Sequence, residues 1–136
     1  MRVVIMGASK VGITIASVLF KEGHKIAMID LDEDAFNFIP DNLEVEKIVG
    51  SGTDPAILKQ IEFSGADAFV AATTSDNVNI SAVKTIKTDF GCKVTGKVIY
   101  DPARAKAFNE IEKGIICPIY DAALRFKESV IATPSQ

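Results

Sequence analysis

The sequence has little of what metal sites and disulfide-bonded folds require. Its 136 residues include two cysteines, one histidine and no tryptophan. Cys92 and Cys117 are far apart in the sequence, and His24 is the one histidine. A structural zinc site needs about four ligands. We therefore expect no metal site, and we expect both cysteines to be free, buried thiols in a reducing cytoplasm.

An excess of positive charge is also absent. The formal net charge is −3 and the pI is about 5.1. Proteins that bind duplex nucleic acid usually present a basic face, so we expect no nucleic-acid partner. With 48% hydrophobic and 24% charged residues, the composition is that of a soluble globular protein. The length suits one domain with its own core.

A long uninterrupted apolar run is missing as well. The mostly apolar segment 3–20 is broken by Lys10, whereas a spanning helix needs roughly 20 apolar residues. No small-residue cleavage site of the kind that ends a signal peptide follows at 21–24. The sequence therefore predicts an unprocessed, cytoplasmic protein.

What is present is a regular alternation of short β-branched runs and longer helical patterns. Strands are predicted at 3–6, 25–29, 43–49, 66–72, 93–100 and 114–117. Helices are predicted at 11–22, 32–38, 76–90, 102–113 and 120–132, with a further helix capped by Thr53 or Asp54 and carrying Pro55 at its first position. This order predicts an α/β fold with a doubly wound parallel sheet of about six strands, Rossmann-like.

A glycine-containing loop follows the first predicted strand. Residues 7–12, Gly-Ala-Ser-Lys-Val-Gly, resemble the dinucleotide fingerprint G-x-G-x-x-G, with Ser9 in place of the middle glycine. That glycine normally lets the backbone approach a pyrophosphate, so a Cβ there crowds the phosphates, although the hydroxyl could donate to one. The first amides of the following helix and Lys10 favour an anion.

An acidic pair ends the second predicted strand. Asp30 stands about 20 residues beyond the loop, where a carboxylate binds a ribose diol in dinucleotide sites. A carboxylate there disfavours the 2′-phosphate of NADP relative to NAD or an adenine mononucleotide. The alternative is that Asp30 and Asp32 merely cap the next helix.

Two further polar segments, 50–54 and 71–76, end at the same edge of the predicted sheet, where ligands of such folds bind. Their small residues leave room for a base and a ribose, although Thr53 and Ser75 also suit ordinary helix caps. The candidate binding residues are Gly7, Ala8, Ser9, Lys10, Val11, Gly12, Asp30, Leu31, Asp32, Gly52, Thr53, Asp54, Ala72, Thr73 and Thr74. No catalytic residue is predicted, because His24 falls at the opposite edge.

These motifs in this order resemble the N-terminal nucleotide-binding domain of potassium-transport regulators, the TrkA-N, KTN or RCK family. The resemblance rests on 3–12 with 30–32, on 50–54, on Ala71-Ala72-Thr73 leading to Asp76 and Asn79, on Asp101-Pro102, and on 114–118. Ser9, Ser51 and Val98 depart from the family pattern, which has glycine, usually aspartate and often arginine there. With fewer phosphate contacts, a mononucleotide is favoured more than in a typical member.

The resemblance implies a cytoplasmic ligand sensor rather than an enzyme, acting at the inner face of the membrane through a potassium channel or transporter subunit. Family members bind NAD(H) or AMP, ADP and ATP, and assemble as dimers or gating rings. Residues 1–118 would form the nucleotide-binding domain, and 119–136 a crossover helix and tail, part of the same domain or swapped onto a partner. The chain would be a stand-alone sensor or a fragment lacking a C-terminal lobe.

The resemblance also implies surfaces for a partner subunit. The helix around 83–90 and the helix after Pro102 would face the partner, and the final helix would cross onto it. Ile119, Ala123, Phe126 and Val130 form one apolar stripe on that final helix. The alternative is an ordinary core-facing helix, since such a stripe is the usual mark of core packing.

Two other functions stay open. An NAD-dependent oxidoreductase domain would need an acid or base near the strand ends, and Lys97 is the only nearby lysine on a later strand. A structural dimerisation module with a decayed site would be consistent with Ser9.

Overall fold

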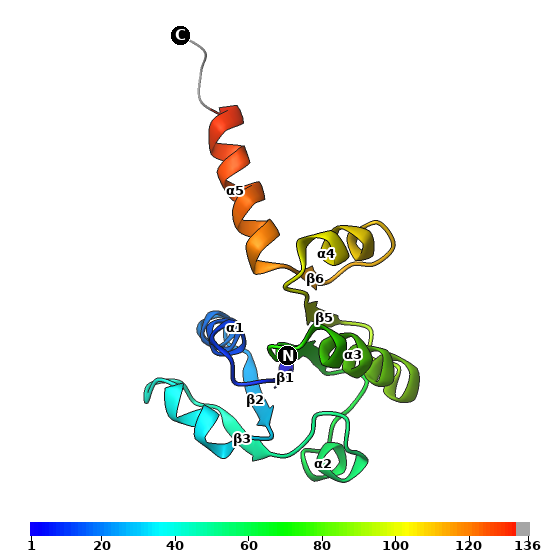
Figure 1. Cartoon of the computed structure of the whole chain (residues 1–136). Helices are drawn as coiled ribbons and strands as arrows, with labels where there is room; N and C mark the ends of the chain where they lie inside the picture. The colour runs from blue at the N-terminus through cyan, green and yellow to red at the C-terminus, as the bar shows by residue number, and fades with distance from the viewer. Residues whose placement is uncertain (133–136) are drawn as a thin grey trace.

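The computed structural model describes residues 1–132, and within them six strands form one parallel sheet (Figure 1). The strands are β1 (Arg2–Met6), β2 (Lys25–Asp30), β3 (Glu46–Val49), β4 (Ala68–Ala71), β5 (Thr95–Val98) and β6 (Ile115–Ile116). Their order is β3-β2-β1-β4-β5-β6, and each neighbouring pair is parallel. The predicted doubly wound α/β fold is confirmed. The tail expected at 133–136 lies outside the described residues.

The connecting helices begin where the sequence places good capping residues. They are α1 (Lys10–Lys21), the 3-10 helix η1 (Glu33–Phe38), α2 (Pro55–Gln60), α3 (Asp76–Phe90), α4 (Pro102–Asn109) and α5 (Pro118–Ala132). The N-cap side chains that accept a first-turn amide are Ser9, Asp32, Asp54, Ser75 and Asp101. Gly91, at φ +63°, ends α3 in the left-handed conformation that glycine favours.

Two predicted boundaries are wrong by three residues or more. The helix after Pro102 ends at Asn109 rather than 113, because the carbonyl of Phe108 accepts the amides of Ile111 and Glu112 and closes the chain into a turn. The third strand begins at Glu46 rather than 43, because Leu43 instead donates its amide to Pro40 in a turn.

Helices cover both faces of the sheet, and β1 supplies side chains to both cores. Val3 and Ile5 join the core beneath α1 and η1, whereas Val4 and Met6 join the core beneath α2 and α3. Successive side chains of a strand point to opposite faces, so a strand covered on both sides must be apolar throughout. This requirement explains the continuous apolar run that opens the chain.

The last helix lies apart from both cores. Figure 1 shows α5 extending away from the sheet, and within Pro118–Ala132 no side chain is buried. Ile119, Phe126 and Val130 are 58%, 71% and 61% exposed. The alternative of a core-facing final helix is therefore wrong. The first turn of α5 packs against the rest of the protein, where Tyr120 contacts a small cluster of Ile99, Ala105 and Cys117.

Helix α3 packs on the sheet through its apolar side chains, and its role as a partner surface stays a prediction. Val83 and Ile86 are 2% and 0% exposed in the core beneath this helix. Phe90 packs edge-on against Phe63, with ring centroids 5.3 Å apart. The apolar stripe of α3 thus covers its own sheet. Among the helices of residues 1–132, none is long and apolar enough to span a membrane.

Candidate nucleotide-binding site

A cavity of about 480 Å³ lies at the carboxyl edge of the sheet, where β1 to β4 end. In open parallel sheets, ligands bind outside this edge, at the switch in strand order. Here the switch lies between β1 and β4. The lining residues are Met6, Gly7, Ala8, Ser9, Ile29, Asp30, Leu31, Asp32, Ala35, Gly50, Ser51, Gly52, Thr73, Thr74, Ser75 and Val78.

The glycine loop between β1 and α1 is closely packed against the end of β4. Gly7 has φ +105°, and a Cβ there would lie 2.7 Å from the carbonyl oxygen of Ala72. A Cβ on Gly12 would overlap the carbonyl oxygen of Gly7. Both outer glycines of the fingerprint are therefore required by the geometry of this turn.

Ser9 is held by two hydrogen bonds within the chain. Its hydroxyl donates to the carbonyl oxygen of Ala72 at 2.6 Å and accepts the amide of Gly12 at 3.1 Å. The sequence suggested that this hydroxyl could donate to a phosphate. In the structure its one proton goes to Ala72 instead, so the side chain joins the loop to β4.

Three amides at the start of α1 remain available. Among the hydrogen bonds of residues 1–132, none is donated by the amides of Ser9, Lys10 or Val11. Unpaired amides at a helix N-terminus and the positive end of the helix dipole together attract an anion. Lys10 is exposed and lines a neighbouring groove, whose wall shares Ala8, Ser9 and Asp32 with the cavity.

Asp30 ties two loops together at the cavity wall. Its carboxylate accepts the amide of Ala8 at 2.8 Å and the amide of Asp32 at 2.8 Å, one on each oxygen. Asp32, not Asp30, is the N-cap of η1, where it accepts the amide of Asp34. The capping alternative is thus right for Asp32 alone. Each oxygen of Asp30 keeps acceptor capacity for a hydroxyl of a ligand.

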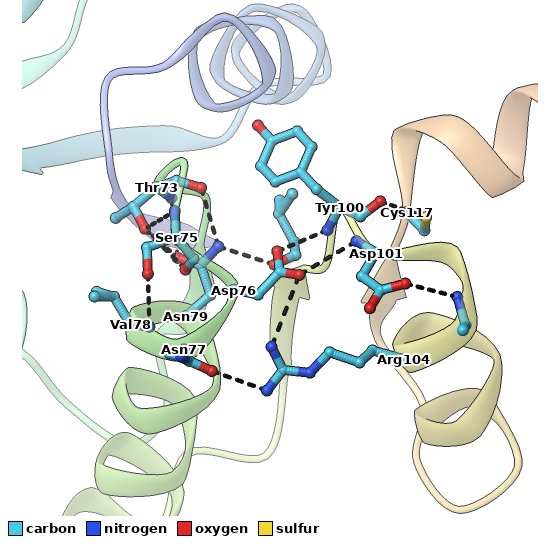
Figure 2. A network of polar contacts seen from close by, with 12 residues as sticks. Thr73, Ser75, Asp76, Asn77, Val78, Asn79, Tyr100, Asp101, Arg104 and Cys117 are labelled. Atoms are coloured by element: carbon cyan, nitrogen blue, oxygen red, sulfur yellow. Dashed lines mark hydrogen bonds and ion pairs between the residues drawn. The ribbon is translucent and has the colours of Figure 1, made fainter.

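The loop after β4 is fixed by a buried amide side chain (Figure 2). Asn79 is 0% exposed, and its Oδ1 accepts the amide and the hydroxyl of Thr73, at 3.0 and 2.7 Å. Its Nδ2 donates to the carbonyl oxygens of Thr73 and Val98, at 3.0 and 2.9 Å. Asn79 therefore holds the cavity wall at Thr73 against the end of β5.

Asp76, one turn earlier in α3, also joins this helix to the segment that follows β5. Figure 2 shows its carboxylate between α3 and the start of α4, where it accepts the amide of Tyr100 at 2.7 Å and the amide of Asp101 at 3.2 Å. Arg104 reaches the same carboxylate at 4.0 Å. The polar groups at the end of β5 are thus paired within the chain.

The structure brings together only part of the predicted site. The predicted residues that line the cavity are Gly7, Ala8, Ser9, Asp30, Leu31, Asp32, Gly52, Thr73 and Thr74. Those that do not line it are Lys10, Val11, Gly12, Thr53, Asp54 and Ala72. Asp54 caps α2, since its Oδ1 accepts the amide of Ala56 at 2.9 Å.

Several lining residues were missed, among them Ala35 and Val78. Both are small or medium apolar residues in the first turns of helices, a position that normally indicates core packing. No local signal in the sequence distinguishes them. Ser75, which the sequence placed in the candidate segment 71–76 and also as a helix cap, both caps α3 and lines the cavity.

The other chemically active groups lie away from this cavity. Lys97 is buried, with its Nζ 3.0 Å from a carboxylate oxygen of Glu112 and 4.3 Å from the ring centroid of Phe108. His24 and Arg2 line a larger, open groove at the opposite edge, where Arg2 pairs with Glu46 and Asp67. The carboxyl-edge cavity is the better ligand site, because ligands of open parallel sheets bind at that edge and the unpaired amide of Ser9 lies in its wall.

Both cysteines are buried, as expected, and lie in different clusters. Burial raises the pKa of the Cys92 thiol, whose Sγ donates to the carbonyl oxygen of Asp67. Within residues 1–132, no group of three or more His, Cys, Asp or Glu residues is arranged to hold a metal ion.

The fold and the cavity define a Rossmann-type domain with a ligand crevice at the carboxyl edge of its sheet. The chain belongs to the TrkA-N domain family, whose match covers residues 3–118. It is 33% identical over 111 residues, 82% of this chain, to the Trk system potassium uptake protein TrkA of Streptomyces coelicolor. It is 31% identical over 98% of its length to a TrkA homolog of Methanothermobacter thermautotrophicus. The chain spans 50% and 62% of the lengths of these two relatives.

Solved structures share the fold at low sequence identity. The "Shewanella denitrificans Kef CTD in AMP bound form" superposes with a TM-score of 0.73 at 13% identity, over 98% of this chain and 83% of that one. The NAD(P)-binding domain of an exopolyphosphatase-related protein from Archaeoglobus fulgidus gives 0.72 at 14% identity, over 96% and 98% of the two chains. At these identities the likeness establishes the fold alone.

Proposed function

We propose that this chain is the nucleotide-sensing part of a cytoplasmic regulatory subunit of a potassium uptake channel or transporter. One observation carries the proposal. A single cavity combines the glycine loop, where the amide of Ser9 is unpaired, with the Asp30 carboxylate, and these are groups that a nucleotide's phosphate and ribose hydroxyls require. The relatives named as potassium uptake proteins support a role in potassium transport.

The ligand on this proposal is an adenine nucleotide, either NAD(H) or AMP, ADP or ATP. Asp30 and Asp32 both line the cavity, and their negative charge disfavours the 2′-phosphate of NADP. A similar fold carries AMP in the Kef structure. Regulation would follow if the nucleotide bound two assembly states with different affinities, because a ligand shifts an equilibrium only through such a difference.

A second copy of the chain is the proposed partner of α5. The exposed stripe of Ile119, Phe126 and Val130 would cross onto the other subunit. An apolar groove of about 500 Å³, formed mainly by α1 and bounded by Ile116 and Pro118, lies at the base of this helix and is suited to receive it. The ring or dimer so formed would act on the membrane subunit.

The test is calorimetric titration with AMP, ADP, ATP, NAD and NADH, together with thermal melting in each ligand. We expect saturable binding and a rise in Tm with ligand concentration. Asp30→Ala removes the ribose acceptor and two loop contacts, so its affinity should fall at least about tenfold. Asp54→Ala is the matched control, because Asp54 accepts a backbone amide at the same edge but does not line the cavity.

Failure of every nucleotide to bind, together with unchanged potassium uptake on deletion of the gene, would contradict the proposal. If each nucleotide changed the Tm of the native and Asp30→Ala proteins by the same amount, a structural dimerisation module would be favoured instead, and the exposed apolar face of α5 is consistent with that function. Turnover of NADH with a small carbonyl substrate would favour an oxidoreductase, although Lys97 lies outside the cavity.

A further inference from the structure

The side chain of Ser9 bridges the junction between the two halves of the sheet. A dinucleotide that occupies a fold of this kind lies across the switch in strand order, with one nucleotide on each side. The switch here is the junction of β1 with β4, and the hydroxyl of Ser9 spans it to reach Ala72 at 2.6 Å. In the fingerprint, this position is a glycine so that the pyrophosphate can approach the backbone.

The cavity lies over the ends of β1, β2 and β3, and the loop after β4, beyond this boundary, forms its far wall. Its wall comes from the ends of β1, β2 and β3 and from the loop between β4 and α3, with Asp30, Gly52 and Thr73 as representatives. No residue that follows β5 lines it within the described chain. The space is therefore bounded on the side where the second nucleotide of a dinucleotide would lie.

On the second side, backbone polar groups at the end of β5 are already paired within the chain. The amides of Tyr100 and Asp101 both donate to Asp76, and the carbonyl oxygen of Val98 accepts Asn79 (Figure 2). The ring of Tyr100 packs with the core beneath α1. A second ribose or base there would have to displace hydrogen bonds that the chain already makes.

From these three observations we infer that the cavity selects an adenine mononucleotide over NAD, and that Ser9 is the residue that determines this preference. The inference rests on the proposed function and narrows it. The phosphate of a mononucleotide can bind at the unpaired amide of Ser9 in the cavity wall, next to the groove that Lys10 lines, and it need not cross Ser9. The pyrophosphate of NAD must cross Ser9, where it meets the Cβ and a hydroxyl whose proton is already donated.

The experiment compares AMP, ADP and NAD by calorimetry on the native chain, Ser9→Gly and Ser9→Ala. The native chain should bind AMP or ADP at least about tenfold more tightly than NAD. Ser9→Gly removes both the Cβ and the bridge and should shift the ratio of the two dissociation constants toward NAD by about tenfold or more. Ser9→Ala keeps the Cβ, so its shift should be smaller. Circular dichroism melts establish that each variant is folded.

Equal or tighter binding of NAD by the native chain would overturn the inference, and so would an unchanged ratio in Ser9→Gly. If Ser9→Gly did not fold, the native comparison of AMP with NAD would decide alone. A chain that binds no adenine nucleotide would overturn the proposed function itself, which is a different outcome from binding NAD in preference.

Discussion

The rim of the cavity and helix α5 are stabilised in opposite ways. We call the loops after β4 and β5, together with the first turn of α3, the rim. Its polar groups are paired within the chain, since the buried Asn79 and the half-buried Asp76 bond to the ends of β4 and β5. Along α5, apolar side chains such as Phe126 and Val130 contact solvent over most of their surface. The rim is complete in one copy of the chain, whereas α5 has an apolar face that one copy leaves uncovered.

The difference indicates which interactions stabilise each region. Buried polar groups must be paired, so the rim is fixed by folding itself. A helix of 15 residues with one exposed apolar face gains most of its stability from whatever covers that face. Mutations at the rim should therefore change the free energy of unfolding and ligand affinity, whereas mutations in α5 should change the oligomeric state.

The largest expected effect is the loss of assembly when the α5 stripe is charged. Phe126→Glu combined with Val130→Glu should convert a dimer or larger assembly into a monomer. Each buried apolar side chain of this size contributes about 2 kcal/mol, and the added charges oppose burial. Size-exclusion chromatography with light scattering measures the change.

Arg125→Glu is the control for that experiment. It makes the chain more negative by the same amount, and its side chain lies away from the stripe because successive helical residues are about 100° apart. Assembly that survives the double change, or a native chain that is monomeric throughout, would contradict the prediction and the role proposed for α5.

The next effect is on stability at the rim. Asn79→Ala should lower the free energy of unfolding by about 3 kcal/mol, because it leaves the Thr73 amide and the Val98 carbonyl without their partner. Urea denaturation measures it. Asn77→Ala, two positions earlier on the exposed face of α3, removes only an acceptor for the exposed Arg104 guanidinium at 2.9 Å, and it should change the free energy by less than about 1 kcal/mol. Equal losses in the two variants would contradict a rim fixed by Asn79.

The smallest effect is expected from the outer edge of the same network. Arg104→Ala should cost less than about 1 kcal/mol, because the guanidinium is 42% exposed and lies 4.0 Å from Asp76. The loss should shrink further in high salt, which screens such pairs. A loss as large as that of Asn79→Ala would contradict the prediction, because it would show that the exposed ion pair contributes as much stability as the buried amide.

Local patterns predicted most of the fold because they depend on neighbouring residues. The continuous apolar run of 3–6 predicted a strand covered on both faces, and Pro55 and Gly91 marked a helix start and a helix end. Boundaries that depend on distant partners were less accurate. The third strand begins only where it can pair with β2, at Glu46 opposite Ala27.

The candidate site divides in the same manner. Asp30 and the glycine loop carry a recognisable spacing, and both line the cavity. Val78 and Ala35 line it as well, but apolar residues in the first turn of a helix have the same pattern whether they face a core or a cavity. Thr53 and Asp54 were expected to bind ligand, and Asp54 instead caps α2.

The sequence by itself determined the order of strands and helices, the glycine loop with its serine, and the apolar stripe of the last helix. The tertiary structure decided what the serine and the stripe do. Ser9 bonds to Ala72, 63 positions away, only because β1 and β4 are adjacent in the sheet. The stripe of α5 is exposed because the helix leaves the sheet at Pro118. Periodicity shows which face of an element is apolar, but the arrangement of elements in space determines what that face meets.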